Sequence, residues 1–96
     1  MTTAFTDNGW EDYVYWHTRN PEMANKIMDL LKGIHRDPFV GIGKPTPLRG
    51  PLEGYWSRRI SGGHRLVYRT GGTPMDQTIT IIQARFHYLL DDTIDS

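Results

Sequence analysis

The stretch 54-GYWSRRISGGHRLVYR-69 decides the fold of this chain. Apolar and polar residues alternate on both sides of Gly62-Gly63, a pattern typical of two antiparallel strands joined by a tight turn. The two strands carry four arginines, although like charges on paired strands destabilise a sheet. An anionic ligand is the interpretation that best explains this excess of guanidinium groups. A solvated basic face is the alternative, because such faces are common.

Strand parity predicts which side chains of this region share a face of the sheet. The expected sets are Tyr55, Ser57 and Arg59; Trp56, Arg58 and Ile60; Arg65, Val67 and Arg69; and Ile79, Ile81, Gln83, Arg85 and His87. We therefore expect a concave, partly basic face on one side and an apolar face covered by helices on the other.

Composition limits the class of protein. The chain has 96 residues and no cysteine, which predicts one domain without disulfides or thiolate metal sites. No apolar run approaches the roughly 18 residues of a membrane span, and the N-terminus does not resemble a signal peptide. The net charge is zero, but residues 44–88 are basic whereas residues 1–43 and 89–96 are acidic. A basic surface on a neutral protein is compatible with nucleic acid or another polyanion.

The residues before the hairpin predict two helices. After a short strand at 4–6, Asn8 and Glu11 form a capping-box pattern for the first helix. Asn20-Pro21 predicts the start of the second helix, whose apolar stripe ends near His35. A proline- and glycine-rich loop follows at 38–51, and strands are expected at 53–61, 64–70 and 77–87. The fold class is therefore α+β, with two N-terminal helices packed on a twisted antiparallel sheet.

Arg65 and His87 are the candidate catalytic pair. If the last strand pairs with the middle one, the two side chains lie close together. A fixed guanidinium can stabilise the charge that forms on phosphate oxygens when a ribose 2′-OH attacks. An imidazolium can protonate the leaving 5′-oxygen. The alternative is a structural role, with the hairpin arginine paired with carboxylates and the histidine solvated at a strand end. Spacing alone does not decide between the catalytic and the structural role.

The remaining candidates are weaker. Tyr88 is placed to stack on a base or to handle a proton, and Lys44 and Arg49 are placed to hold phosphates. His17 is expected to pack on the first helix, and His64 to support other residues or to have no role. No group of residues has the spacing of a metal site, so we expect neither a metal nor a cofactor.

Five segments carry a resemblance to a known family. They are Trp10–Trp16, Asp37–Pro45 with Pro47-Leu48, Gly54–Ile60, His64–Tyr68 and Ala84–Tyr88. Over about residues 5–88 they resemble the YoeB/Txe toxins of the RelE-like superfamily, which belong to type II toxin–antitoxin systems. The resemblance implies a microbial-ribonuclease-like domain over residues 1–88 and a cytoplasmic mRNA interferase that cuts in the ribosomal A site. A YefM-like antitoxin, the ribosome with its mRNA, and a homodimer are the implied partners, without a membrane.

The resemblance also implies residue roles. Arg65 corresponds to the arginine that stabilises the phosphate, His87 to the general acid and Tyr88 to the terminal tyrosine. Lys44, Arg49 and Arg59 correspond to the basic residues that hold RNA.

Two positions depart from the family pattern. Thr46 stands where the family has the glutamate that acts as general base, and a threonine hydroxyl cannot accept a proton near neutral pH. Loss of a general base typically lowers a rate by ~10²–10⁴. An acidic tail, residues 89–96, also follows the tyrosine at which the family chain normally ends, and it either shields the basic cleft or dangles in solvent.

Three interpretations of Thr46 stand on the sequence alone. The site is active with a substitute base such as Glu53 or neutral His87, or with little help from a base. Alternatively, the protein is a non-catalytic toxin homologue that binds antitoxin or ribosome. Finally, the threonine is an introduced change. We take an attenuated ribonuclease as the leading hypothesis.

Overall fold

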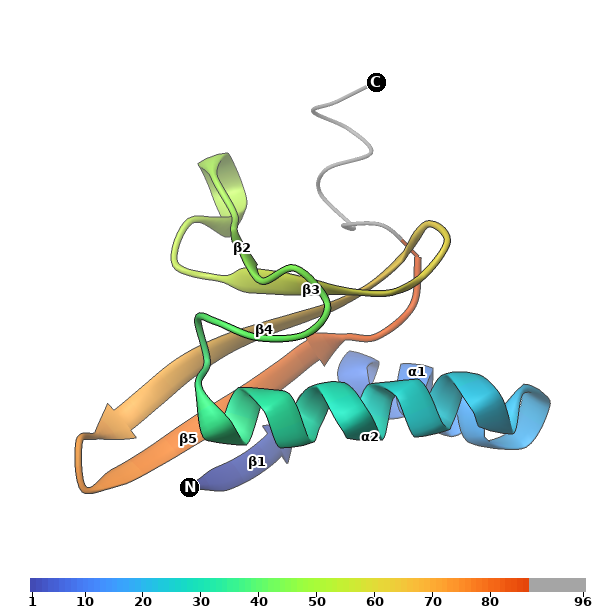
Figure 1. The fold of residues 1–96 in the computed structure, drawn as a ribbon, viewed down its shortest axis with the longest axis horizontal. Coiled ribbons are helices and arrows are strands. Elements are labelled where there is room, and N and C mark those ends of the chain that lie inside the picture. Colours follow the sequence, from blue (N-terminus) through green and yellow to red (C-terminus); the bar gives the residue numbers. More distant parts are fainter. Residues whose placement is uncertain (87–96) are drawn as a thin grey trace.

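The computed structural model describes residues 1–86 and contains two helices packed on a five-stranded sheet (Figure 1). The elements are β1 (Thr2–Phe5), α1 (Asp7–Arg19), α2 (Pro21–Arg36), β2 (Thr46–Pro47), a 3₁₀ turn (Gly50–Leu52), β3 (Trp56–Ser61), β4 (His64–Thr73) and β5 (Asp76–Gln83). The strand order is β1-β5-β4-β3-β2. The predicted α+β class is confirmed. One pair departs from an all-antiparallel sheet, because β1 runs parallel to β5.

The starts of the two helices test the capping predictions. Thr6, not Asn8, caps α1, because its hydroxyl accepts the Gly9 N–H at 3.1 Å. The amide of Asn8 instead donates to the carbonyl of Ile82 at 3.0 Å, so that expected capping box was wrong. Helix α2 begins at Pro21 after Asn20, as predicted.

The core lies between the helices and one face of the sheet. The predicted stripe of α2 is buried, and Ile27 and Ile34 are fully inaccessible. They pack in one cluster with Leu66, Tyr68 and Ile81 from β4 and β5. Each such side chain contributes about 1.5–3 kcal/mol when fully buried. This packing holds one face of the sheet against the helices, so the opposite face is directed away from them.

A bulge in β5 changes the predicted strand parity. Val67 pairs with Gln83, whereas the next residue, Tyr68, pairs with Ile81, so Ile82 is an extra residue in β5. A bulge of this kind reverses the alternation of side chains beyond it. Ile81 therefore shares the core face with Tyr68, and Gln83 shares the opposite face with Val67. The expectation that Ile81 and Gln83 lie on one face was wrong.

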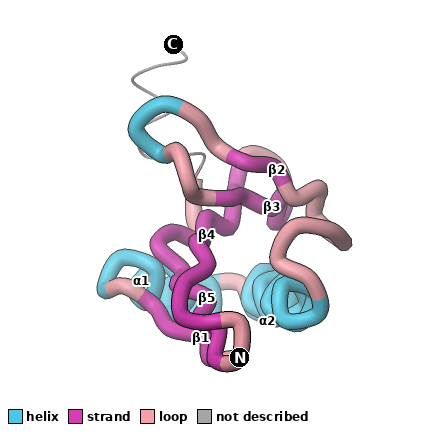
Figure 2. Tube along the Cα trace, turned by 90° about the vertical axis from the view of Figure 1, so that its left-hand side faces the viewer, coloured by secondary structure: helices cyan, strands magenta, loops and turns pink. Residues whose placement is uncertain are grey.

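The end of the sheet that carries β2 projects beyond the helices. Strand β2 and the 3₁₀ turn extend away from α1 and α2, at the end of β3 opposite the Gly62-Gly63 turn (Figures 1 and 2). At the far end of β4, the strand continues to Thr73, so the turn is formed by Pro74 and Met75 rather than by the glycines at 71 and 72. Neither helix of the described chain is long and apolar enough to cross a membrane.

Candidate functional site

Two arginines of the hairpin lie directly opposite each other on β3 and β4. Arg59 pairs with Arg65 in the antiparallel register, on the face away from the helices. Arg59 is exposed and Arg65 is half-buried. The Arg65 guanidinium donates to the carbonyls of Gly62 at 2.8 Å and His64 at 3.1 Å. Within residues 1–86 no carboxylate pairs with either guanidinium, so the described surface concentrates positive charge here.

Arg58, by contrast, does not belong to this surface. It is fully buried on the core face, where Nη2 donates to the carbonyl of Asp37 at 2.7 Å and Nη1 to that of Ile42 at 3.0 Å. Its Nε donates to the Tyr68 hydroxyl at 3.1 Å. A buried charge requires such hydrogen bonds. Arg58 therefore fixes the loop after α2, on the face that strand parity predicted for it, and an anionic ligand is not needed to explain this arginine.

The loop after α2 brings Lys44 and Thr46 to the edge of β3. The backbone N–H of Arg59 donates to the carbonyl of Gly43 at 2.7 Å, and Thr46 pairs with Ser57 in the sheet. The Thr46 hydroxyl donates to the carbonyl of Lys44 at 2.9 Å. Lys44 adopts a left-handed backbone with φ of 54°, which is uncommon outside glycine. Lys44, Thr46 and Arg59 thus lie on adjoining segments.

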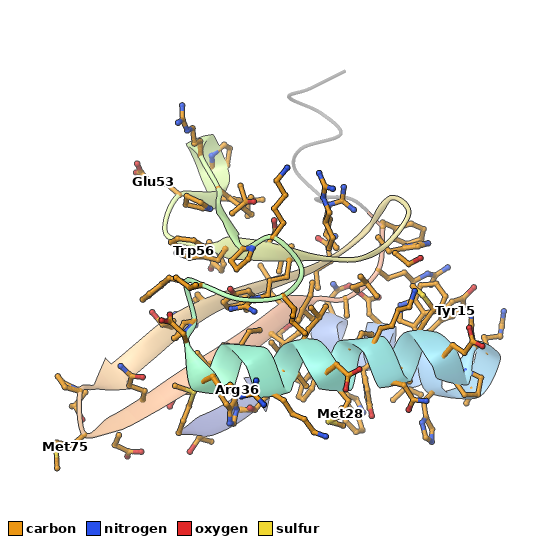
Figure 3. The ribbon with its side chains drawn as sticks, in the orientation of Figure 1. Tyr15, Met28, Arg36, Glu53, Trp56 and Met75 are labelled. Carbon is orange, nitrogen blue, oxygen red and sulfur yellow. The ribbon has the colours of Figure 1, made fainter. Side chains whose placement is uncertain are left out.

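Arg49 and Glu53 lie elsewhere. Arg49 immediately precedes the 3₁₀ turn that projects from the start of β3, away from the Gly62-Gly63 turn (Figure 1). Glu53 follows the same turn and points outward from the sheet (Figure 3). The structure therefore places both residues apart from Arg65, which stands at the opposite end of the hairpin.

Ala84, the residue after β5, is tied to α1 by two hydrogen bonds. The buried Asp12 carboxylate accepts the Ala84 N–H at 3.0 Å, and Trp16 Nε1 donates to the Ala84 carbonyl at 2.8 Å. Burial raises the pKa of Asp12 above its usual 3.8, while the Ala84 N–H and the charge of Arg85 oppose this shift. Both backbone polar groups of Ala84 are therefore held by side chains of one helix.

The next residues are tied to β4. Phe86 N–H donates to His64 Nδ1 at 2.8 Å, and the Phe86 carbonyl accepts from the backbone N–H of Arg65 at 2.9 Å. The Gln83 amide donates to the carbonyls of Arg85 at 2.9 Å and Phe86 at 3.3 Å. Phe86 is the last described residue before His87. The predicted residues His87 and Tyr88, and the tail 89–96, lie outside the described residues, so their roles stay predictions.

Sequence reasoning missed a cationic contact beside this segment. The Arg85 guanidinium lies 3.6 Å from the ring centroid of Tyr15, and the Arg19 guanidinium lies 4.9 Å from the same ring. Figure 3 shows Tyr15 at the end of the helices far from Met75. The aromatic run in α1 was visible in the sequence, but its approach to Arg85 depends on the tertiary packing of α1 on β5.

His17, His35 and an apolar groove lie away from Arg59 and Arg65. His17 packs on its own helix as expected, stacked on Tyr13 with a centroid distance of 6.2 Å, although it is exposed. His35 hydrogen-bonds to Thr3 beside an open apolar groove of about 290 Å³. The groove is lined by Thr3, Phe5, Tyr13, Met28, Leu31, Lys32 and His35. In residues 1–86 no three potential metal ligands come together.

Comparison with known proteins identifies the class as bacterial type II toxins. Residues 5–88 match the family model described as "YoeB-like toxin of bacterial type II toxin-antitoxin system". Toxin YoeB of Streptomyces coelicolor is 51% identical over 88 residues, covering 92% of this chain and all of the relative. The chain belongs to the YoeB-like toxin family.

Solved structures agree with this assignment. The YoeB/ParE toxin from Agrobacterium tumefaciens superposes with a TM-score of 0.87 at 46% identity, covering 92% of this chain and 100% of that one. The YoeB dimer from Staphylococcus aureus gives a TM-score of 0.82 at 40% identity, covering 92% and 98%. A YoeB–YefM complex from Staphylococcus aureus is similar at a TM-score of 0.80 and 40% identity, with the same coverage.

Proposed function

We propose that this toxin is an attenuated endoribonuclease that cleaves mRNA in the ribosomal A site. The observation that carries the proposal is the hydrogen bond from Arg65 N–H to the Phe86 carbonyl at 2.9 Å. It joins the hairpin arginine to the residue that directly precedes His87. The Arg59–Arg65 pair beside it, with which no carboxylate of residues 1–86 pairs, adds the positive charge that a phosphodiester requires.

The chemistry is an internal transesterification. The ribose 2′-oxygen attacks the adjacent phosphorus, the bond from phosphorus to the 5′-oxygen breaks, and a 2′,3′-cyclic phosphate forms. Arg65 stabilises the charge on the non-bridging oxygens. His87 in its protonated form gives its proton to the leaving 5′-oxygen, and Tyr88 orients His87 or a base. Lys44, Arg49 and Arg59 hold flanking phosphates.

The proposed reaction needs a group that accepts the proton of the 2′-OH. Thr46 occupies the edge of β3 where the family resemblance places a glutamate, and its hydroxyl already donates to the carbonyl of Lys44. Glu53 points away from the hairpin (Figure 3), which disfavours it as a replacement. Either solvent takes the proton while protonated His87 serves as the acid, or His87 starts neutral, takes the proton and then passes it to the leaving 5′-oxygen. In both cases the rate is lower than with a dedicated general base. This is the reason for proposing attenuation rather than full activity.

Cleavage of ribosome-bound mRNA by wild type, Thr46→Glu and Thr46→Gln tests the proposal. We expect the glutamate variant to cut faster by ~10²–10⁴. Glutamine has nearly the same size and no proton acceptor, so it should remain at the wild-type rate. Equal acceleration by both variants would contradict a missing general base. If the wild type leaves no A-site cuts where Thr46→Glu does, the enzymatic proposal fails although the family assignment remains.

The second candidate function is a non-catalytic toxin homologue that binds antitoxin or ribosome, and Thr46 is the observation that favours it. In that case Arg65→Ala and His87→Ala leave the growth of expressing cells unchanged, while antitoxin still co-purifies. A growth defect relieved by either substitution rules this candidate out.

The partners follow from the relatives. Because the Staphylococcus aureus proteins form a YoeB dimer and a YoeB–YefM complex, we propose a cytoplasmic homodimer neutralised by a YefM-like antitoxin. An acidic, initially disordered antitoxin segment covers the Arg59–Arg65 surface and repositions Tyr88. Raising the salt concentration should weaken the complex, and binding insensitive to salt would argue for a mainly apolar contact.

A further inference from the structure

Phe86 has a backbone conformation that a non-glycine residue rarely adopts. Its φ is 65°, which costs of order 1–3 kcal/mol and persists only where surrounding contacts impose it. Three hydrogen bonds do so here: its N–H donates to His64 Nδ1, and its carbonyl accepts from the Arg65 N–H and from the Gln83 amide. A left-handed residue turns the chain sharply, so Phe86 sets the course of the backbone at the last described position.

The ring of His64 is well fixed for this contact. It lies edge-on against the indole of Trp16, with centroids 4.8 Å apart, and 6.0 Å from the Phe86 ring. Because Nδ1 accepts a hydrogen bond, it carries no proton, and a neutral ring then bears its hydrogen on Nε2. A side chain without an acceptor atom at the position of Nδ1 therefore cannot make this hydrogen bond to Phe86.

The same residue is also tied to the hairpin arginine. The Arg65 guanidinium donates to the His64 carbonyl at 3.1 Å, and the Arg65 backbone donates to Phe86. One short segment, 64–65, therefore holds both the guanidinium and the backbone that leads to residue 87. Of these contacts within segment 64–65, only the hydrogen bond of the His64 side chain to the Phe86 N–H can be removed by a substitution that leaves Arg65 unchanged.

We propose that His64 is a positioning residue, which holds Phe86 in its left-handed conformation and thereby places His87 against the phosphate bound by Arg65. The proposal rests on the proposed ribonuclease function. It assigns His64 no contact with RNA and no proton transfer. A displacement of about 1 Å in such a site costs on the order of 10²-fold in rate.

Three substitutions separate this role from general stability. Asparagine places an acceptor oxygen near the position of Nδ1, glutamine places its amide farther out, and alanine removes the acceptor. In ¹⁵N relaxation of the full chain, we expect the Phe86 amide order parameter of His64→Ala and His64→Gln to fall from about 0.85 towards 0.6. His64→Asn should keep the wild-type values. Unchanged order in His64→Ala would overturn the proposal.

Single-turnover cleavage of ribosome-bound mRNA, in a Thr46→Glu background, gives the functional readout. His64→Ala and His64→Gln should cut about 10²-fold more slowly at saturating toxin, with the half-saturating toxin concentration unchanged. His64→Asn should recover most of the rate. Equal loss in His64→Asn and His64→Ala, or no loss at all, would overturn the positioning role.

The two proposals fail differently. If the Thr46→Glu background itself does not cut, the ribonuclease function is wrong. The order parameters then still decide whether His64 holds the chain before His87: loss of order confined to the alanine and glutamine variants supports the contact, and its absence overturns it.

Discussion

Arg59 and Arg65 face each other directly across β3 and β4, with no carboxylate of the described residues between them. Like charges directly opposite on paired strands destabilise a sheet, so this pair lowers the stability of the hairpin that carries it. An anion bound between the two guanidinium groups would offset this repulsion. The arrangement therefore predicts that stability and ligand binding respond in opposite directions to removal of one charge.

Arg59→Gln should raise the free energy of unfolding by about 0.2–1 kcal/mol while weakening binding of single-stranded RNA. The gain should shrink as salt is added, because salt screens the repulsion between exposed charges. Urea unfolding at two salt concentrations measures the first effect and fluorescence anisotropy the second.

Arg69→Gln is the matched control for this pair. Arg69 is also an exposed arginine of β4, but it pairs with Thr80 rather than with a cation. Its substitution should leave the free energy of unfolding nearly unchanged. If both variants gained the same stability, the effect would reflect net charge and not the Arg59–Arg65 contact.

Arg58 should dominate the stability of the loop after α2. Arg58→Ala leaves the carbonyls of Asp37 and Ile42 without their donors and creates a cavity, so we expect a loss of about 3–5 kcal/mol. Tyr68→Phe removes only a hydroxyl, which accepts from Arg58 and donates to the Pro38 carbonyl at 2.6 Å, and should cost about 1–3 kcal/mol. Urea midpoints that ranked the two variants in the reverse order would contradict this assignment.

Tyr68 also predicts a loss of stability in alkali. Burial raises its pKa above 10.0, although Arg58 opposes the shift. The folded state thus keeps a proton that the unfolded state has lost, so stability is complete below pH 10 and falls as the pH rises through the folded value. Urea titrations between pH 9 and 11 should show a steeper decline for wild type than for Tyr68→Phe. Parallel declines would mean that Tyr68 titrates normally.

Much of the fold was predictable from the sequence because its signals are local. The stripe around Ile27 and Ile34 repeats every three or four residues, which only a helix with one buried face explains. Gly62-Gly63 between alternating strands likewise predicts one hairpin. These signals depend on neighbours in the chain, and the structure confirms them.

The errors concern contacts between distant residues. The extra residue in β5, Ile82, cannot be recognised from the alternation of residues in the sequence, but it moves Gln83 to the other face of the sheet. The burial of Arg58 was implied by its shared parity with the core-facing Trp56 and Ile60 positions, but the number of arginines favoured an anion site. The contact between His64 and Phe86 carries no sequence signal at all, because it joins positions 22 residues apart.

Asp12 offers a second pH-dependent test, at acidic rather than alkaline pH. Its pKa is raised mainly by burial, so its contribution to stability is complete below pH 3.8 and declines as the pH rises through the folded value. Asp12→Asn keeps an oxygen acceptor for the Ala84 N–H without a buried charge. At pH 7 it should be at least as stable as wild type, and the stability difference between them should disappear on acidification.

Asp12→Ala is the companion variant. It leaves the buried Ala84 N–H without an acceptor, which should cost about 1–3 kcal/mol at pH 7. Thermal unfolding of the three proteins from pH 3 to pH 7 separates the charge of Asp12 from its hydrogen bond. An asparagine variant as unstable as the alanine variant would show that the carboxylate charge itself is required, through Arg85.

The close approach of α1 to β5 gives the last prediction. A Cβ atom at Gly9 would lie 2.4 Å from the carbonyl oxygen of Ile81, which is backbone and cannot move aside. On an open helix, Gly→Ala stabilises by up to about 1 kcal/mol, but here the clash should reverse the sign and cost about 1–3 kcal/mol. Gly63→Ala, where a Cβ meets nothing within 4 Å, is the control and should change the urea midpoint little. Stabilisation by Gly9→Ala would mean that α1 lies farther from β5 than the structure places it, and the hydrogen bonds of Asp12 and Trp16 to Ala84 would then have to be longer as well.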